Sequence, residues 1–366
     1  MKVLHINAGL EKGGGLFHIV NLLTEAKLEK RDFELLTLAE GPVSSAAVSK
    51  GIKTTVLKTK SRYDLTSLKK LIDYINDNNF DIVHTHGPRA NLYLSLIHKK
   101  IKAKWVITVH SDPTKDFEGR GLVGFIFTQL NVHALRKADG ILAITKNFAN
   151  LLTQKLKLNP EKIHVIYNGI FFHTGAQIPA KYEHPYFNII NVARCEKIKG
   201  QDLLIKALKD LHDSHIRLHI AGDGSELENL KQLASDLNVA NQVTFHGFVS
   251  HDELGSLYQK MDLAVLTSYS ESFPLVLLEA ADNLIPLLST DVGDIKKMIP
   301  SPDYGFVSPI GDLEMIKEQI LKASLMSASE LREMAKKEKK YLEHNFSVRE
   351  QLATVLDAYG EIENAK

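Results

Sequence analysis

Short apolar runs rich in β-branched residues recur along the chain, and stretches with helical periodicity separate most of them. In the first half these runs cover residues 2–8, 33–39, 54–57, 81–86, 105–110, 141–145 and 163–167, with helical patterns at 65–76 and 89–99. Strands that alternate with helices are typical of a parallel sheet covered on both faces. The pattern predicts an α/β fold.

The strand pattern stops and then starts again in the second half. Residues 172–180 show no periodicity, and new apolar runs follow at 188–193, 216–221, 242–248, 263–267, 286–289 and 305–307. A chain of 366 residues also exceeds the size at which one hydrophobic core usually stops growing. We therefore expect a domain over 1–172, a linker over 173–184 and a second domain over 185–346. Residues 347–360 predict a final helix with Ser347 as N-cap and Glu350 in the capping box.

Composition places the chain among ordinary globular proteins of a reducing compartment. Hydrophobic residues make up 44% and charged residues 24%, and the one cysteine excludes an internal disulfide. The sequence starts directly with a predicted strand, without the features of a signal peptide, and no apolar run approaches the ~20 residues of a membrane span. We expect a cytoplasmic protein.

The net charge of +1 conceals a strong asymmetry between the two halves. Residues 1–170 hold 25 basic and 15 acidic residues, which leaves 20 basic and 29 acidic residues in the remainder. A basic first half suggests an anionic partner such as a membrane surface or a lipid-phosphate acceptor. Nucleic acid is not expected, because no nucleic-acid-binding motif accompanies the charge. The alternative is a set of solvated lysines without a partner.

The segment 270–280 carries two carboxylates eight positions apart, Glu271 and Glu279, on either side of an apolar run. Pro274 suits the first turn of a helix, where the amides of Leu275 and Val276 could hold a diphosphate. One acid could then grip sugar hydroxyls and the other a ribose. The alternative is a buried helix whose N-terminal acid is favoured by the helix dipole.

Two cations follow the first strand of the second half. Arg194 and Lys199 lie five positions apart, and together they could neutralise a departing diphosphate. Phe248 ends a later predicted strand of the same half. Surface cations are the alternative reading of the first two residues.

The first half offers glycines and histidines at strand ends. Gly13, Gly14 and Gly15 precede a helix that carries His18, and their backbone could approach a ligand or simply form a flexible turn. Two further histidines, His84 and His86, end one strand before Arg89, and His110 ends the next. Metal binding at His84 and His86 would need a third ligand that the sequence does not locate. The chain also lacks an Asp-x-Asp pair, so no metal cofactor is expected.

These segments resemble the motifs of one enzyme family over nearly the whole chain. Segment 270–280 resembles the glutamate–seven–glutamate signature of the retaining glycosyltransferases with the GT-B fold, specifically glycosyltransferase family 4. The glycine loop with His18, the Asp-Ile-Val-His-Thr-His segment at 81–86, the Thr-Val-His segment at 108–110 and the pair Arg194 and Lys199 are similar to further family motifs. Ala193 and Cys195 replace the usual glycine and leucine, and Asp294 stands where a second glycine is common.

The resemblance implies two Rossmann-like, doubly wound domains that face a central cleft, with the helix at 347–366 packed back on the first domain. It implies catalytic roles for His110, Glu271, Arg194 and Lys199. It implies donor binding by Gly13, Gly14, Arg194, Lys199, Phe248, Glu271, Pro274, Leu275, Val276 and Glu279. On the acceptor side it implies Gly15, His18, His86 and Arg89.

The function implied is metal-independent transfer of a sugar, with retention of configuration, from a nucleotide-diphosphate sugar to a hydroxyl group. UDP-sugars are the first expectation for the donor, and a saccharide or lipid-linked molecule for the acceptor. Synthesis of a bacterial surface polysaccharide or glycolipid, on the inner face of the plasma membrane, is the expected setting. Two alternatives stay open: a nucleotide-sugar epimerase or phosphorylase of the same architecture, and a non-catalytic nucleotide-sugar sensor. A nicotinamide dehydrogenase ranks lower, because the dinucleotide fingerprint is absent after the first strand.

Overall fold

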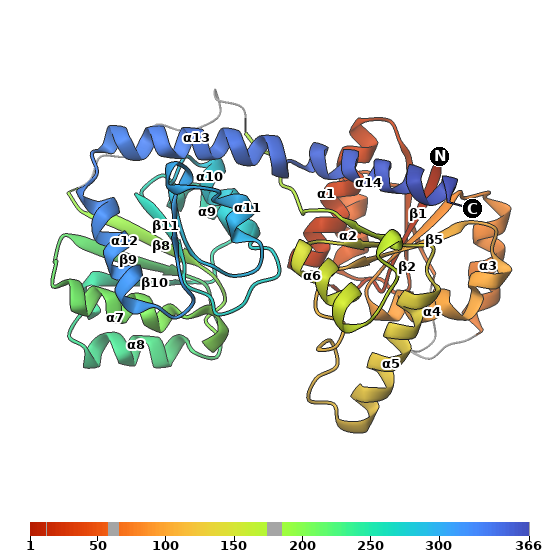
Figure 1. The fold of residues 1–366 in the computed structure, drawn as a ribbon, viewed down its shortest axis with the longest axis horizontal. Coiled ribbons are helices and arrows are strands. Elements are labelled where there is room, and N and C mark those ends of the chain that lie inside the picture. The colour runs from red at the N-terminus through yellow and green to blue at the C-terminus, as the bar shows by residue number, and fades with distance from the viewer. Residues whose placement is uncertain (12, 58–65, 174–184, 366) are drawn as a thin grey trace. The chain divides into compact units, whose positions relative to one another are not determined.

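The computed structural model describes residues 1–11, 13–57, 66–173 and 185–365. The chain divides into two compact units, and each is described by itself (Figure 1). The N-terminal unit comprises Met1–Phe171 together with Ser347–Lys366, and the C-terminal unit comprises Phe172–Phe346. Apart from His173, the predicted linker at 173–184 lies outside the described residues.

The N-terminal unit is built on a parallel sheet of seven strands in the order β3-β2-β1-β4-β5-β6-β7. The strands are β1 Lys2–Asn7, β2 Asp32–Thr37, β3 Thr54–Val56, β4 Ile82–His86, β5 Lys104–Val109, β6 Gly140–Ala143 and β7 Ile163–Val165. All seven strands predicted in this half are confirmed, with ends that differ by no more than two residues. Apolar runs locate these strands because parallel strands are buried on both faces.

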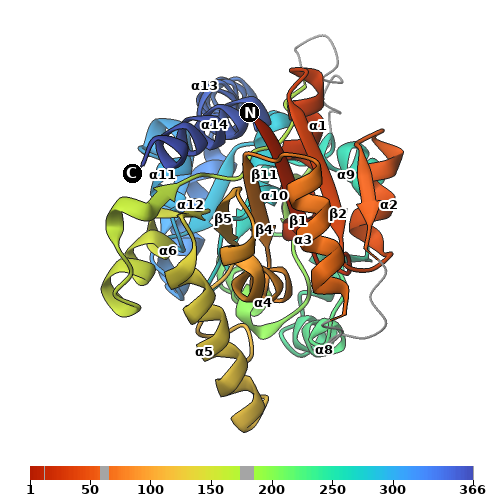
Figure 2. The ribbon, with the colours of Figure 1, turned by 90° about the vertical axis from the view of Figure 1, so that its right-hand side faces the viewer.

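Helices cover both faces of this sheet, and an apolar core fills each interface (Figures 1 and 2). One face carries α3 Ser67–Asp77, α4 Pro88–Ile97, α5 Gly121–Lys137 and α6 Lys146–Asn150. The other face carries α1 Gly14–Leu28, α2 Pro42–Ser49 and α14 Val348–Asn364. The chain therefore returns to its first unit with its last helix.

The start of α14 is fixed by the predicted cap. The Ser347 side chain accepts a hydrogen bond from the Glu350 amide at 3.2 Å, which confirms Ser347 as the N-cap. Farther along the helix, Tyr359 is fully buried and its hydroxyl lies 2.5 Å from Nδ1 of His84 on β4. The final helix is thus part of the core that surrounds the strand-end histidines.

The C-terminal unit has a parallel sheet of six strands in the order β10-β9-β8-β11-β12-β13. Its strands, predicted to within two residues, are β8 Phe187–Val192, β9 Ile216–Ala221, β10 Val243–Gly247, β11 Leu263–Leu266, β12 Leu287–Thr290 and β13 Phe306–Ser308. Its helices are α7 Gln201–Leu211, α8 Leu227–Asp236, α9 His251–Tyr258, α10 Leu275–Asp282, α11 Ile295–Met298, α12 Leu313–Leu325 and α13 Ala328–Phe346.

Both sheets share one topological feature. In each sheet the strand order reverses at the first strand of the unit. β1 lies between β2 and β4, and β8 lies between β9 and β11. Ligands of doubly wound sheets bind outside the carboxyl ends of the strands at such a reversal. The two units therefore confirm the expected pair of Rossmann-like folds. No helix within the described ranges is both long and apolar enough to cross a lipid bilayer.

Candidate functional site

The C-terminal unit brings Lys199 and Glu271 into direct contact at the carboxyl edge of its sheet. Lys199 Nζ lies 2.7 Å from Glu271 Oε1, and both side chains are largely buried. Ser268 Oγ donates a second hydrogen bond of 2.6 Å to the same oxygen. Two residues that lie far apart in the sequence thus form one fixed ion pair, held by a third side chain.

The turn that carries Lys199 is locked against the end of β11. Gly200 adopts a left-handed conformation with φ of 63°, and a side-chain carbon there would lie 2.3 Å from the carbonyl oxygen of Thr267. Thr267 Oγ1 donates to the Gly200 carbonyl at 2.9 Å. Only glycine allows this approach, and the approach sets the direction in which the lysine leaves the backbone.

Helix α10 starts directly after Pro274, which is its N-cap rather than a member of its first turn. The first backbone hydrogen bond runs from the Leu277 amide to the Pro274 carbonyl at 3.1 Å, so the amides of Leu275 and Val276 precede it. Amides at this position suit an anion. Glu279 lies one turn farther along α10, where its negative charge adds to the main effect of burial in raising the pKa of Tyr258.

Arg194 and Phe248 lie apart from this ion pair. Arg194 Nη1 pairs with Glu196 Oε1 at 2.5 Å, and the arginine side chain is exposed. Phe248 follows β10 and is 81% exposed. The structure therefore joins Lys199 to Glu271, whereas Arg194 has a partner within its own loop.

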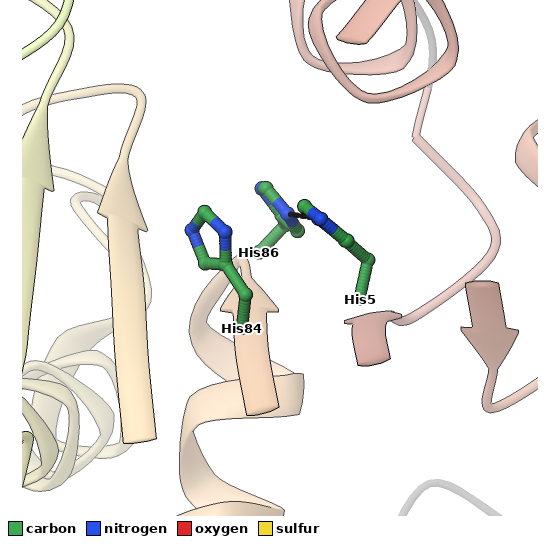
Figure 3. Close-up of side chains that lie close together, drawn as sticks. All are labelled: His5, His84 and His86. Carbon is green, nitrogen blue, oxygen red and sulfur yellow. Dashed lines mark hydrogen bonds between the residues drawn. The ribbon is translucent and has the colours of Figure 1, made fainter. Parts of the chain in front are cut away.

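The N-terminal unit gathers five histidines at the carboxyl edge of its sheet. His5 lies on β1 directly opposite His84 on β4, and His86 follows on the same face of β4 (Figure 3). His110 follows β5, and its ring meets that of His18 on α1 edge-on, with centroids 4.6 Å apart.

Three of these rings form a hydrogen-bonded chain. His5 Nδ1 lies 2.9 Å from His86 Nε2, and His86 Nδ1 lies 3.2 Å from His110 Nε2. Burial lowers the pKa of all five histidines, to about 3 for His5 and about 4 for His18, and well below the usual value for the others. The rings are therefore neutral at neutral pH, and each carries one N–H group.

The histidine cluster also contains side chains of a kind that bind metal ions. His5, His84 and His86 offer one nitrogen each within 4.8 Å of one another, as do His18, His86 and His110. Three neutral imidazoles would suit Zn²⁺. However, His84 uses Nε2 for Thr108 Oγ1 at 2.6 Å and Nδ1 for Tyr359. His5, His86 and His110 use their facing nitrogens for one another, and His18 uses Nδ1 for Asn168. These hydrogen bonds account for the close packing of the rings without an ion.

A pocket of about 230 Å³ opens beside His110. Besides His110, its polar lining includes Glu11, Asp116, Asn91 and Asn131. Burial raises the pKa of both Glu11 and Asp116. The pocket thus combines weak acids, amides and a neutral imidazole, which are groups that can hydrogen-bond a polyhydroxylated ligand.

The glycines of the first loop make room for Glu11. A side-chain carbon at Gly15 would lie 2.8 Å from one carboxylate oxygen of Glu11, and one at Gly87 would lie 2.7 Å from the other. At Gly13 and Gly14, by contrast, such a carbon would meet no heavy atom of the described residues within 4 Å beyond the adjacent backbone. Gly13 is the N-cap of α1, with φ of 67°. The backbone of Gly13 and Gly14 therefore borders open space.

The residues expected on the acceptor side lie in three different surroundings. Gly15 lines the pocket with His110, whereas His18 and His86 are buried and contact the ring of His110 instead. Arg89 lies in the first turn of α4, with its guanidinium carbon 5.8 Å from the ring centroid of Tyr93. His18 and His86 can therefore act on a ligand only through His110.

Sequence reasoning did not identify His5, Glu11 or Asp116. His5 occupies the same position on β1 as His84 on β4, so a search for histidines near several predicted strand ends would have found it. Glu11 stands just before the glycines, and Asp116 in the long loop after His110. Their common signal is an acid within a loop that follows a buried strand.

Comparison with known proteins assigns both units to one family. The description "Glycosyltransferase Family 4" matches residues 12–171, and "Glycosyl transferases group 1" matches residues 177–341. The N-acetyl-alpha-D-glucosaminyl L-malate synthase of Bacillus anthracis is 27% identical over 71% of this chain and 69% of its own length. The O-antigen biosynthesis glycosyltransferase WclY of Escherichia coli is 28% identical over 80% of both chains.

Solved structures agree on the fold. The crystal structure of HepE from Anabaena in complex with UDP superposes with a TM-score of 0.82, at 17% identity, over 98% of this chain and all of the other. Two parallel-sheet units, matches to both family descriptions and this likeness lead to one conclusion: the chain is a glycosyltransferase of family 4 with the GT-B fold.

Proposed function

We propose that this glycosyltransferase moves a sugar from a UDP-sugar to a hydroxyl group of a saccharide or lipid-linked acceptor, with retention of anomeric configuration. The observation that carries the proposal is the Lys199–Glu271 ion pair, 2.7 Å long and largely buried, at the strand ends of the C-terminal unit. Burying two charged side chains costs desolvation free energy, so such a pair is not expected in a surface loop that binds no ligand. The UDP bound to the structurally similar Anabaena protein supports the choice of donor.

In this proposal the C-terminal unit holds the donor. Lys199 neutralises the diphosphate as it leaves, and the amides of Leu275 and Val276 hydrogen-bond its oxygens. Glu271 accepts hydrogen bonds from the sugar hydroxyls, and Glu279 accepts them from the ribose. The exposed Arg194 exchanges Glu196 for the diphosphate, and Phe248 packs on the base. The backbone of Gly13 and Gly14, which borders open space, also contributes to donor binding in this proposal.

The acceptor binds in the pocket beside His110, where Gly15 and the polar lining contact its hydroxyl groups. Arg89, which follows the pocket residues Gly87 and Pro88 in the chain, contributes a positive charge for an anionic acceptor in this proposal. His18 and His86 orient the ring of His110. The acceptor oxygen attacks from the same face that the diphosphate leaves, and the departing phosphate takes its proton.

Neutral histidines decide which nitrogen of His110 carries the proton. If His5 Nδ1 donates to His86 Nε2, then His86 Nδ1 donates to His110 Nε2, and His110 presents an N–H at Nδ1. The reverse direction would leave a buried N–H at His5 Nε2, which has no hydrogen-bond partner among the described residues. An unused lone pair is better tolerated there than an orphaned N–H. His110 therefore donates from Nδ1 and stabilises charge in the transition state.

The proposed reaction needs no metal ion, because Lys199 and Arg194 supply positive charge at the diphosphate. Synthesis of a bacterial surface polysaccharide or glycolipid, in the cytoplasm, is the setting that we propose. The name of the Escherichia coli relative, an O-antigen biosynthesis glycosyltransferase, supports a role in surface polysaccharide synthesis.

The test starts with the purified protein and a panel of UDP- and GDP-sugars. Donor binding raises the unfolding temperature, so a thermal shift identifies the nucleotide sugar. Incubation of that donor with saccharide acceptors, with and without EDTA, should yield a glycoside whose anomeric configuration by NMR equals that of the donor. An inverted product would refute retention, and loss of activity in EDTA would refute metal independence. Conversion of the donor alone to an isomer would indicate an epimerase, and tight binding without turnover a sensor.

A further inference from the structure

Helix α5 exposes an unusual amount of apolar surface. It runs from Gly121 to Lys137 and extends beyond the body of the N-terminal unit (Figures 1 and 2). Five of its large apolar side chains are exposed: Leu122 by 76%, Val123 by 57%, Phe125 by 62%, Ile126 by 48% and Leu130 by 38%. A surface helix normally turns such residues toward the core. Contiguous apolar surface of this kind marks an interaction site.

The arrangement of these residues shows what shape of partner would cover them. At 3.6 residues per turn, the arc from Phe125 through Leu122 to Val123 spans about 160° of the helix. The seam of a helix pair is narrower than this. A wide apolar arc at the end of a projecting helix suits a partner that surrounds it on several sides, as the boundary region of a lipid bilayer does.

The charges on helix α5 itself and at its N-cap are basic. Arg120 precedes the helix, and Arg136 continues the same arc at its far end, after the apolar residues. No aspartate or glutamate occurs between Arg120 and Arg136. The half of the chain that contains α5 carries 25 basic and 15 acidic residues. An apolar arc flanked by arginines, on a basic unit, is complementary to anionic headgroups above an acyl layer.

We propose that α5 docks the protein on an anionic lipid surface, with Leu122, Phe125 and Ile126 entering the boundary between headgroups and acyl chains. The other face of the same helix contributes Asn131 and Leu135 to the pocket beside His110. Docking through α5 therefore brings that pocket to the lipid surface, where the sugar of a lipid-linked acceptor would lie. The lipid contact itself does not depend on the proposed transfer reaction, and it can be measured without a donor or an acceptor.

The experiment compares binding of the full-length protein to two kinds of vesicle at low salt. One kind is pure phosphatidylcholine, and the other contains phosphatidylglycerol as the anionic lipid. The variant Leu122→Ser/Phe125→Ser/Ile126→Ser should bind the anionic vesicles at least tenfold more weakly than the wild type, because three apolar contacts are lost. Leu325→Ser is the matched control: Leu325 ends α12 of the C-terminal unit and is 78% exposed. This control should bind like the wild type.

A second variant tests the electrostatic part. Arg120→Gln/Arg136→Gln should weaken binding to the anionic vesicles by about fivefold per charge, with little effect on pure phosphatidylcholine. Emission of the single tryptophan, Trp105, reports whether the N-terminal unit stays folded in each variant, because that residue lies in the core strand β5.

Equal binding by the wild type and the triple variant would overturn the proposal, as would equal affinity for the two kinds of vesicle. The size of the protein in solution tests the rival occupant of the arc, a second copy of the chain. A wild-type dimer that the triple variant converts to monomer would identify a protein interface and overturn lipid docking. A wild-type protein that binds anionic vesicles but transfers no sugar would leave the docking proposal standing and refute the proposed function.

Discussion

The two units share a topology but stabilise their strand-end residues in opposite ways. The C-terminal unit fixes a charged pair, Lys199 and Glu271, at 2.7 Å. The N-terminal unit packs five histidines whose pKa values are lowered by burial, so that its polar cluster is neutral. Fixed charges suit the binding of a diphosphate, and neutral donors suit the recognition of hydroxyl groups. One scaffold can thus build two chemically different sites.

Loss of the charged pair should have the largest effect on activity. Lys199→Ala should lower the rate of transfer by about 10²–10³-fold, because one preorganised cation at the departing diphosphate is removed. The matched control is Lys206→Ala, which removes the lysine of a pair with Asp202 on α7 of the same unit, also 2.7 Å long. A steady-state assay should show wild-type activity for the control. Equal activity of both variants would exclude the proposed role of Lys199.

A substitution in the hydrogen-bonded chain of neutral histidines should have a smaller effect on activity than loss of Lys199. His86→Gln should lower kcat/KM by about 10–100-fold, because it removes the partner that orients His110. The change should also shift the ¹⁵N signals of His110, since its Nε2 loses the facing Nδ1 of His86. His98→Gln, at the end of α4, provides the control. Unaltered His110 signals in the His86 variant would show that the ring chain does not set the tautomer.

The two units should also respond differently to acid. A histidine whose pKa is lowered by folding contributes stability that is present above its unfolded value of 6.5 and lost as pH falls. The N-terminal unit should therefore open first as pH drops from 6.5 toward 4, at a cost on the order of a few kcal/mol. Trp105 fluorescence reports this unit, and reaction of the buried Cys195 with 4,4′-dithiodipyridine reports the other. Simultaneous opening at every pH would contradict the difference between the units.

One acid in the C-terminal unit should produce the smallest effect, in the opposite direction. Burial raises the pKa of Glu338 well above its usual value, so its contribution to stability is present below about pH 4.5 and is lost as pH rises. Glu338→Gln should stabilise this unit at pH 8 by on the order of 1 kcal/mol. The gain should vanish as pH approaches 4.5. Thermal unfolding of variant and wild type at both pH values measures it, and destabilisation at pH 8 would disprove a neutral Glu338.

The strand positions could be predicted from sequence, because buried parallel strands leave apolar runs that need no tertiary information. The contacts between distant segments could not. Lys199 and Glu271 were each identified as site residues, but their ion pair depends on the glycine turn at 200 that meets Thr267. His5 was missed because its partners belong to β4, and only strand pairing brings them together.

The exposure of the apolar side chains on α5 could not be predicted from the sequence either. No helix was predicted over residues 122–130, and apolar side chains normally indicate a core rather than an exposed surface. Their unusual position follows from the way α5 extends beyond the sheet, and that depends on how the preceding loop folds (Figure 2). Helix direction is a property of packing rather than of local composition.

The return of α14 to the first unit has a consequence for synthesis. Val355 and Tyr359 complete a core that begins with β1, although the entire C-terminal unit is translated between them. Domains generally fold in order as they leave the ribosome. The N-terminal unit can therefore complete its core only after α14 has left the ribosome. Until then its histidines remain accessible to water.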